Sequence, residues 1–378
     1  MKRLLTVLVC VLSVISLLVG CAGTPAAPTA TTAPAPKATA ATAPTAAPAP
    51  ATPAAANPAP AKQSLTVVRV GNMQVLSGAG VFVAQEKGYF KEQGIEVQQT
   101  YFDTGQQMIP ALASGQLDVG SGAISTGLFN AIIRDIPLKI VAGQSSQPAG
   151  FGANGLVVRK DLFDSGKFKD YSDLKGKRIA IPAKGTASDI LLDIALKKGN
   201  LTYKDVDVVE MPLPDMTTAL ANKSIDVALQ NEPSRTISVA KGVGVAWKGG
   251  DQIYPGQVFT AWVYSPKFAE NRELGDRFMV ALLKGVRDLE DAFMKKDPKA
   301  RAEIIPMLTK TLSVKDPAIY DKMTAAYLHP NGRFDPKLLE ADQNWYIEHG
   351  FQKEKVDFTK AVDFSFVDYA VKQLGEYK

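Results

Sequence analysis

The sequence predicts an α/β fold with two lobes, each a mainly parallel sheet flanked by helices. Apolar strand-like runs alternate along the chain with amphipathic helix-like segments, a pattern typical of parallel sheets that helices cover on both faces. The part with globular composition, from Leu65 to Lys378, is about twice the usual size of one domain. A motif also recurs within this part, as expected for two similar lobes.

The recurring motif is MIPALASGQLDVG, which begins at Met108, and MTTALANKSIDVA, which begins at Met216. Each copy follows a strand-like run and a helix that closes with Lys and Gly, so the repeated unit is strand, helix, strand, helix, strand. Chance similarity between two unrelated units is the alternative, because Ala and Leu are common. The identical positions are Met108/Met216, Ala111/Ala219, Leu112/Leu220, Ala113/Ala221, Asp118/Asp226 and Val119/Val227.

The N-terminus has the pattern of an export signal. Lys2 and Arg3 precede a short apolar run, and the run ends in Leu18-Val19-Gly20-Cys21, which resembles the lipobox of bacterial lipoproteins. We therefore expect residues 1–20 to be a signal peptide and Cys21 to be the lipid anchor. An uncleaved membrane helix is the alternative, although the apolar run is short for a membrane span.

Residues 21–63 consist almost entirely of Ala, Pro and Thr and cannot bury a core. Frequent prolines favour extended polyproline conformations of about 3.1 Å per residue, so this segment would reach on the order of 100 Å. We expect a disordered tether between the lipid anchor and the globular part. A featureless disordered tail is nearly the same interpretation, and only the lipobox distinguishes the two.

The composition excludes several kinds of function. The only other cysteine is Cys10, in the expected signal peptide, so disulfides, thiol chemistry and cysteine metal sites are excluded from the mature part. The two histidines, His329 and His349, are expected to be surface or cap residues, and we predict no metal and no cofactor. Without Lys2 and Arg3 the net charge falls from +5 to +3, and no basic stretch is interleaved with aromatics, so no nucleic-acid partner is expected.

The stretch RIAIPAKGTASDILLDIALKKG, residues 178–199, predicts a strand, a turn and a helix in immediate succession. Thr186 or Ser188 is the expected N-cap of that helix. The first backbone N–H groups of a helix lack intrahelical partners, and this end can bind a carboxylate, a sulfonate or another acceptor group. In the alternative interpretation, the Thr or Ser hydroxyl and Asp189 satisfy these N–H groups and no ligand is involved.

Four motifs in this order resemble a known family. VFVAQEKGYFKEQGIEV, ALASGQLDVG, DLKGKRIAIPAKGTASD and ALANKSIDVALQNEP are similar to the substrate-binding proteins of nitrate, sulfonate, taurine and pyrimidine ABC importers, which share the type II periplasmic binding protein fold. The resemblance covers most of Leu65 to Val263. It implies a ligand cleft between the lobes, since ligands lie beyond the carboxyl ends of the strands.

The resemblance also implies the organisation of the globular part. Residues 64–153 would form the first part of lobe 1, residues 154–258 lobe 2, and residues 259–378 the hinge return and the C-terminal helices of lobe 1. We expect the hinge near GLVVRK (155–160) and VFTAWVYSPKF (258–268). Trp262 and Tyr264 in the latter are expected to be either lobe core or a stacking surface for the ligand.

The ligand-binding residues that the resemblance implies lie on four loops and at one position on the hinge side. Besides the loop before the helix within residues 178–199, discussed above, three loops have a structural alternative: a plain connection after the first strand, a helix cap for Ser125, and a solvent-facing Glu232 or its pairing with Arg235. If Glu232 contacts the ligand, Glu232→Gln should alter ligand preference with little loss of stability. The implied residues are Gln74, Ser77, Gly78, Ala123, Ile124, Ser125, Gln144, Gly185, Thr186, Ala187, Ser188, Asn231 and Glu232.

The function implied is capture of a small organic solute by lobe closure and its delivery to a membrane permease. The solute would be a sulfonate, a carboxylate or a pyrimidine-like compound, and the partners would be an ABC permease and its ATPase. The protein would be a monomer outside the cytoplasm, anchored to the membrane through Cys21. A ligand-binding sensory lipoprotein is one alternative, and an enzyme of thiamine-pyrimidine synthesis is another, for which this sequence lacks the Cys-rich motif.

Overall fold

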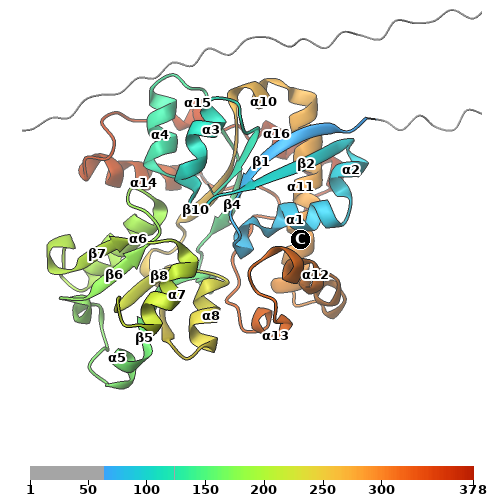
Figure 1. Cartoon of the computed structure of the whole chain (residues 1–378). Helices are drawn as coiled ribbons and strands as arrows, with labels where there is room; N and C mark the ends of the chain where they lie inside the picture. The colour runs from blue at the N-terminus through green and yellow to red at the C-terminus, as the bar shows by residue number, and fades with distance from the viewer. Residues whose placement is uncertain (1–63, 123) are drawn as a thin grey trace, which may run out of the picture. The chain divides into compact units, whose positions relative to one another are not determined.

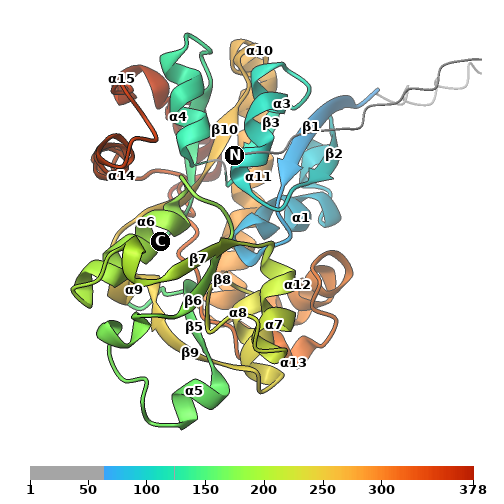
Figure 2. The same ribbon diagram turned by 60° about the vertical axis from the view of Figure 1, so that its left-hand side comes forward.

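The computed structural model describes residues 64–122 and 124–378, which form two five-stranded sheets, one in each lobe (Figures 1 and 2). The sheet of lobe 1 contains β1 (Thr66–Asn72), β2 (Ile95–Tyr101), β3 (Val119–Ser121), β4 (Lys139–Ser146) and β10 (Val258–Tyr264). The sheet of lobe 2 contains β5 (Asn154–Arg159), β6 (Arg178–Ile181), β7 (Asp207–Glu210), β8 (Val227–Asn231) and β9 (Gly244–Gly249). The predicted α/β fold class is confirmed.

Both sheets have the same strand order. The order is β2-β1-β3-β10-β4 in lobe 1 and β7-β6-β8-β5-β9 in lobe 2. One strand in each sheet, β10 or β5, is antiparallel to both of its neighbours, and the remaining strands run in one direction. The strands that start at Val119 and Val227, one in each copy of the recurring motif, occupy equivalent places, which explains the repeat as two similar lobes.

The repeated aspartates fix the register of equivalent strand pairs. Asp118 Oδ2 accepts a 2.8 Å hydrogen bond from the backbone N–H of Arg69, and Asp226 Oδ2 accepts a 2.9 Å bond from the backbone N–H of Arg178. The backbone N–H of each aspartate donates in return to the carbonyl of the same arginine, at 2.9 Å and 2.8 Å. The motif therefore recurs because each sheet needs the same link between its first and third parallel strands.

Helices cover the two sheets. The part of lobe 1 that precedes lobe 2 in the chain carries α1 (Ala79–Glu86), α2 (Tyr89–Glu92), α3 (Ile109–Ala113) and α4 (Thr126–Ile133), with 3-10 turns η1 (Leu76–Gly78) and η2 (Gly105–Met108). Lobe 2 carries α5 (Lys160–Asp164), α6 (Ala187–Lys198), α7 (Leu213–Ala221), α8 (Ser234–Ala240) and α9 (Gly250–Ile253), with η3 (Tyr171–Leu174) and η4 (Tyr203–Asp205). The C-terminal part carries α10 (Pro266–Glu270), α11 (Arg272–Phe293), α12 (Pro298–Thr311), α13 (Pro317–Tyr320), α14 (Lys337–Glu348), α15 (Phe358–Ala361) and α16 (Ser365–Leu374).

The long amphipathic helix α11 is the main cover of the first sheet and packs against α1 and α16 (Figure 1). Tyr264 packs edge-on against Phe268 and Phe366 beneath it, with ring centroids 4.7 and 5.0 Å apart. Trp262 and Tyr264 are fully buried in this apolar cluster, so they belong to the core of lobe 1.

The C-terminal segment contacts both lobes rather than lobe 1 alone. Helix α14 packs against α4 of lobe 1 and α6 of lobe 2. His329 was expected at the surface or in a cap, but it is buried, and its Nε2 lies 2.6 Å from Ser146 Oγ. Burial lowers the pKa of His329 to about 4, so this imidazole is neutral at physiological pH. His349 is the C-cap of α14.

Several sequence-based predictions lie outside the described residues. They are the signal peptide, the lipid anchor Cys21, the tether up to residue 63, and Ala123 of the third-strand loop. Within residues 64–122 and 124–378, no helix combines the length and the apolar composition that crossing a membrane requires.

Candidate functional site

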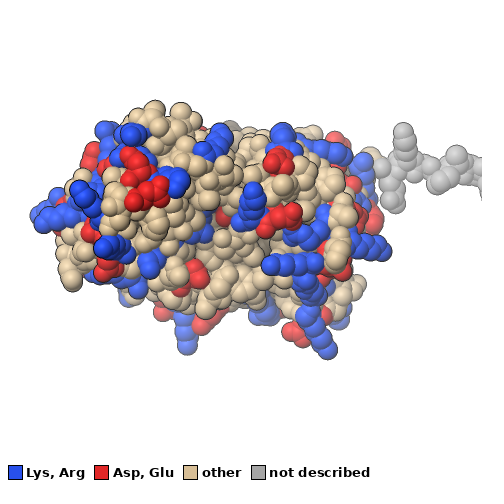
Figure 3. Space-filling view, turned by 90° about the horizontal axis from the view of Figure 1, so that it is seen from below, with Lys and Arg blue, Asp and Glu red and all other residues tan. Residues whose placement is uncertain are grey.

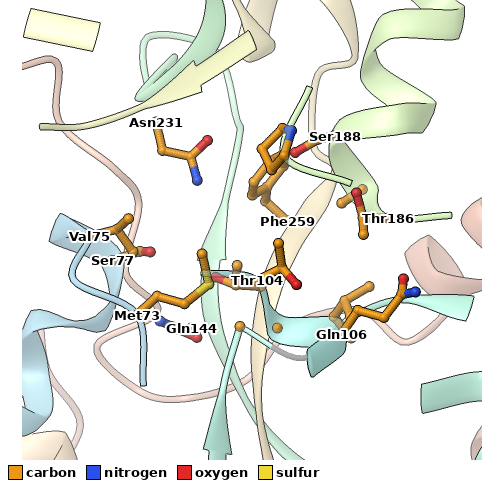
Figure 4. Close-up of a pocket in the computed structure, with 16 residues that line it drawn as sticks. Met73, Val75, Ser77, Thr104, Gln106, Gln144, Thr186, Ser188, Asn231 and Phe259 are labelled. Carbon is orange, nitrogen blue, oxygen red and sulfur yellow. The ribbon is translucent and has the colours of Figure 1, made fainter. Parts of the chain in front are cut away.

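A cavity lies where the carboxyl ends of the parallel strands of both lobes face each other (Figure 4). Its empty volume is about 510 Å³, including space open to solvent. Segments just beyond β1, β2, β3 and β6, the ends of β4 and β8, and the start of the antiparallel β10 supply its walls. The lining residues are Met73, Val75, Ser77, Thr104, Gly105, Gln106, Gly122, Ile124, Gln144, Pro182, Thr186, Ala187, Ser188, Asn231, Phe259 and Thr260.

Seven of the twelve described residues that were expected to bind the ligand line this cavity. They come from both lobes, and their contact with a ligand stays a prediction. The seven are Ser77, Ile124, Gln144, Thr186, Ala187, Ser188 and Asn231.

The other five described candidates lie beside the cavity. Gln74 lines an adjacent void, and its side-chain amide donates a 3.0 Å bond to the carbonyl of Thr311. Gly78 is buried at the start of α1, and Ser125 is the N-cap of α4, where its Oγ accepts from the N–H of Leu128 at 3.3 Å. Gly185 and Glu232 make contacts between the lobes, which are described below.

The start of α6 forms one wall of the cavity. Thr186 is its N-cap residue, as predicted, but the Thr186 hydroxyl donates to the carbonyl of Ala183 at 2.8 Å instead of capping the helix. The carboxylate of Asp189, in the first turn of α6, accepts from the N–H of Gly185, which lies just before the N-cap, at 2.9 Å. Tyr203 donates to the other Asp189 oxygen. Burial raises the pKa of Asp189, and the bond from Tyr203 opposes that rise.

The two lobes touch each other directly beside the cavity. The N–H of Thr126, at the start of α4, donates to the carbonyl of Gly185 at 2.9 Å, and Ser125 pairs with Thr186 in a short antiparallel bridge. At a second contact, the N–H of Leu76 donates to the carbonyl of Glu232 at 3.1 Å. These backbone bonds hold the lobes together in the structure described.

Glu232 lies behind the cavity wall rather than in it. Its side chain is 2% exposed, and its two oxygens accept from the N–H groups of Thr324 and Thr236 at 3.2 and 3.1 Å. It borders a separate small void that also touches Ser77 and Asn231. Arg235 is buried nearby and donates to the carbonyl of Gly152 at 3.0 Å. Glu232 therefore joins lobe 2 to the C-terminal segment.

Sequence reasoning missed several lining residues. Thr104, Gly105 and Gln106 follow β2, and the rule that ligands lie beyond strand ends would have found them. Phe259 and Thr260 were placed only within an expected hinge segment. They reach the cavity because β10 runs antiparallel to its neighbours, which brings its first residues to the edge where the other strands end.

The described side chains that line the cavity are uncharged. None of the described lining residues is Asp, Glu, Lys, Arg, His or Cys, so the wall offers no nucleophile with an adjacent base. In residues 64–122 and 124–378, no group of three or more His, Cys, Asp or Glu side chains is placed to hold a metal ion. Hydroxyl, amide and apolar side chains are all present in the wall, a composition suited to a small polar organic molecule.

Residues 76–292 match the sequence profile of a family described as NMT1/THI5 like. The chain belongs to the NMT1/THI5-like family. The matched residues include both copies of the recurring motif and most of the cavity wall.

One relative of this NMT1/THI5-like chain is a Brucella abortus protein whose name gives a binding role but no ligand. It is 32% identical over 45% of this chain and 50% of its own length. The taurine-binding periplasmic protein of Escherichia coli is 29% identical over 50% of this chain and 56% of its own. An Aspergillus parasiticus enzyme, 4-amino-5-hydroxymethyl-2-methylpyrimidine phosphate synthase, is 28% identical over 43% of this chain and 44% of its own. The chain thus spans about half the length of these three relatives.

Solved structures share the fold more completely. The alkanesulfonate-binding protein SsuA from Xanthomonas axonopodis pv. citri, bound to MOPS, superposes with a TM-score of 0.63 over 79% of this chain and 98% of its own, at 19% identity. This similarity establishes the two-lobed periplasmic binding protein fold for the NMT1/THI5-like chain.

Proposed function

We propose that the protein is the extracytoplasmic substrate-binding component of an ABC importer. It captures a small organic solute between its lobes and delivers it to a membrane permease that works with an ATPase. The observation that carries the proposal is the cavity at the facing strand ends, which is lined by both lobes. Direct contacts between the lobes, such as that between Thr126 and Gly185, lie beside it. The binding roles named for the Brucella and Escherichia relatives support it.

The finer parts of this proposal concern the N-terminus and the state of the protein. Residues 1–20 direct export, Cys21 carries the lipid, and the Ala/Pro/Thr-rich segment is the tether. The protein acts as a monomer. Incorporation of radiolabelled palmitate into the wild-type chain but not into Cys21→Ala would test the anchor.

Nucleic acid is not proposed as a partner. On the face shown in Figure 3, basic and acidic side chains are interspersed rather than gathered by sign. A protein that binds nucleic acid presents a continuous basic surface to the phosphates.

A sensory lipoprotein would share the same cavity, and measuring solute uptake by cells with and without the protein distinguishes import from sensing.

Enzymatic activity is not proposed either, although one relative is a synthase. A reaction on a bound pyrimidine would need a base or a nucleophile in contact with it, and the described cavity wall has only hydroxyls, amides and apolar groups as side chains. We expect that the protein does not convert any compound that it binds. Turnover of such a compound would replace the import proposal with a catalytic one.

The test of binding is a thermal-shift screen of the full chain, purified in detergent, against sulfonates, nitrate, aromatic carboxylates, pyrimidines and amino acids. A ligand at one hundred times its dissociation constant should stabilise the fold by about 2.7 kcal/mol. Ser188→Phe, which fills the cavity, should abolish the shift, whereas Ser172→Phe at an exposed position should not. Equal shifts in both variants would place binding elsewhere.

A further inference from the structure

Three of the residues that line the cavity carry an amide side chain whose oxygen has no hydrogen-bond partner. Gln106 Oε1, Gln144 Oε1 and Asn231 Oδ1 are buried and have no hydrogen-bond partner. The side chains of Gln144 and Asn231 are only 2% and 7% exposed, so water does not readily replace the missing partners. An unpaired buried acceptor destabilises the protein, and a ligand that donates a hydrogen bond to it would remove that cost.

These amides surround the cavity from both lobes. Gln144 is on β4 and Gln106 is on η2 in lobe 1, whereas Asn231 ends β8 in lobe 2 and points into the cavity from above in Figure 4. The Gln144 amide is held in place, because its Nε2 donates to Ser121 Oγ at 2.9 Å. An amide carries both a donor and an acceptor but no charge, and it therefore matches an uncharged polar edge of a ligand.

Between the amides the wall is largely apolar. Met73, Val75, Ile124, Pro182 and Phe259 contribute hydrophobic surface. No basic side chain is among the lining residues that the structure describes, so nothing in direct contact would neutralise an anionic ligand. Removing an ion from water without a counter-charge is strongly unfavourable.

The electrostatics behind the α6 wall also disfavour an anion. Asp189, in the first turn of α6, is 1% exposed and already accepts from the N–H of Gly185. A carboxylate at this place offsets the partial positive charge of the helix N-terminus. Lys184, the nearest cation on this loop, is exposed to solvent. On the other side, the buried Glu232 is accompanied by Arg235, so that pair adds little net charge.

We propose that the ligand is a small molecule that is uncharged at neutral pH, with N–H or O–H donors that meet Gln144 and Asn231 and a flat apolar face that lies against Met73 and Phe259. This inference rests on the proposed function and narrows it. It sets this cavity apart from one that binds a sulfonate or nitrate, the kinds of anion named for several proteins of the same fold. A primary carboxamide or an amino-substituted nitrogen heterocycle has the required chemistry.

The test compares compounds of matched shape and different charge by thermal shift of the full chain. The probes are nicotinamide against nicotinate, benzamide against benzoate and benzenesulfonate, with taurine and nitrate added. The small-molecule fraction of a bacterial extract, separated at pH 7 by anion and cation exchange, extends the test to unknown ligands. Stabilisation by the uncharged probes or by the fraction that neither resin retains is the expected result.

Other outcomes have distinct meanings. Stabilisation by anionic probes or by a retained fraction alone would overturn the inference and leave the binding function intact. If no probe and no fraction stabilises the protein, the result counts against the binding function itself and against the inference with it.

Two variants of matched chemistry test the amides. Gln144→Glu keeps the size of the side chain but places a carboxylate at the wall, so it should weaken binding of the stabilising uncharged compound at least tenfold. Gln98→Glu, on the exposed face of β2, adds the same charge away from the cavity and should bind as the wild type does. Equal affinities for Gln144→Glu and the wild type would show that the Gln144 amide does not meet the ligand.

Discussion

The indole Nε1 of Trp345 donates a 2.7 Å hydrogen bond to Oδ2 of Asp193, and this bond joins α14 of the C-terminal segment to α6 of lobe 2. Both side chains are buried, with exposures of 7% and 3%. Because α6 begins at the cavity wall, the bond ties the C-terminal segment to the element that shapes the site. Asp193 is also paired with Lys197 at 2.8 Å.

Trp345→Phe should destabilise the protein by about 1–3 kcal/mol, because it leaves a buried carboxylate without its neutral donor. Urea denaturation monitored by circular dichroism measures this loss. Trp247→Phe is the control, since Trp247 is partly exposed and packs on Phe168 and Tyr171. Equal losses in the two variants would mean that only indole packing, and not the bond to Asp193, contributes.

Gly185→Ala should open the contact between the lobes. Gly185 has φ +67°, and a Cβ there would lie 2.6 Å from Thr126 Oγ1. Gly115 has φ +71° and open space around its Cα, so Gly115→Ala carries the same backbone strain without the clash. We expect a larger radius of gyration by small-angle X-ray scattering for Gly185→Ala only. An unchanged radius would show that the Thr126 contact does not hold the lobes together.

Asp342→Asn should flatten the pH dependence of stability. Burial raises the pKa of Asp342 to about 7, against the opposing effect of Gln257 and Tyr254. Between about pH 4 and pH 7 the folded protein therefore keeps a proton on Asp342 that the unfolded chain has released. The contribution of this proton to the free energy of unfolding is fully present below about pH 4 and is lost by about pH 7. The loss should be on the order of 1 kcal/mol per pH unit in this window.

The measurement is urea denaturation of the wild type and Asp342→Asn at pH 4, 5, 6 and 7. Some slope should remain in the variant, because burial also raises the pKa of Glu290 to about 7. Glu354→Gln, at an exposed position, should keep the wild-type slope. A wild-type slope in Asp342→Asn would show that Asp342 does not bind this proton.

Glu232→Gln should lower the stability of the ligand-free protein by about 1–3 kcal/mol, because the new NH₂ group faces either the N–H of Thr236 or that of Thr324. Ligand affinity should change little, since Glu232 does not line the main cavity. Melting temperature and titration calorimetry measure the two effects, with exposed Glu340→Gln as the control. Altered ligand preference at unchanged stability would instead restore the expectation drawn from the sequence.

Local patterns in the sequence predicted much of the fold. Alternating strand and helix signals gave both sheets, and the repeated Asp118 and Asp226 marked equivalent strands because the same backbone bond is needed in each. The helix cap that was the alternative interpretation of Ser125 is also present, and it was open to prediction because capping depends on neighbours in sequence.

What could not be predicted depends on distant residues. The burial of Glu232 follows from Thr324, 92 residues further along the chain. Phe259 reaches the cavity only because β10 inserts between β3 and β4, which no local periodicity reveals. The bridging role of α14 likewise depends on Asp193, 152 residues before Trp345.

The place of β10 in its sheet has a consequence for the order in which the protein folds. All five strands of lobe 2 lie within residues 154–249, so this lobe can complete its sheet as soon as that stretch is available. Lobe 1 begins earlier in the chain but lacks the strand between β3 and β4 until residue 264 has emerged. As the chain is synthesised, lobe 2 is thus able to complete its sheet first, and lobe 1 completes its sheet last.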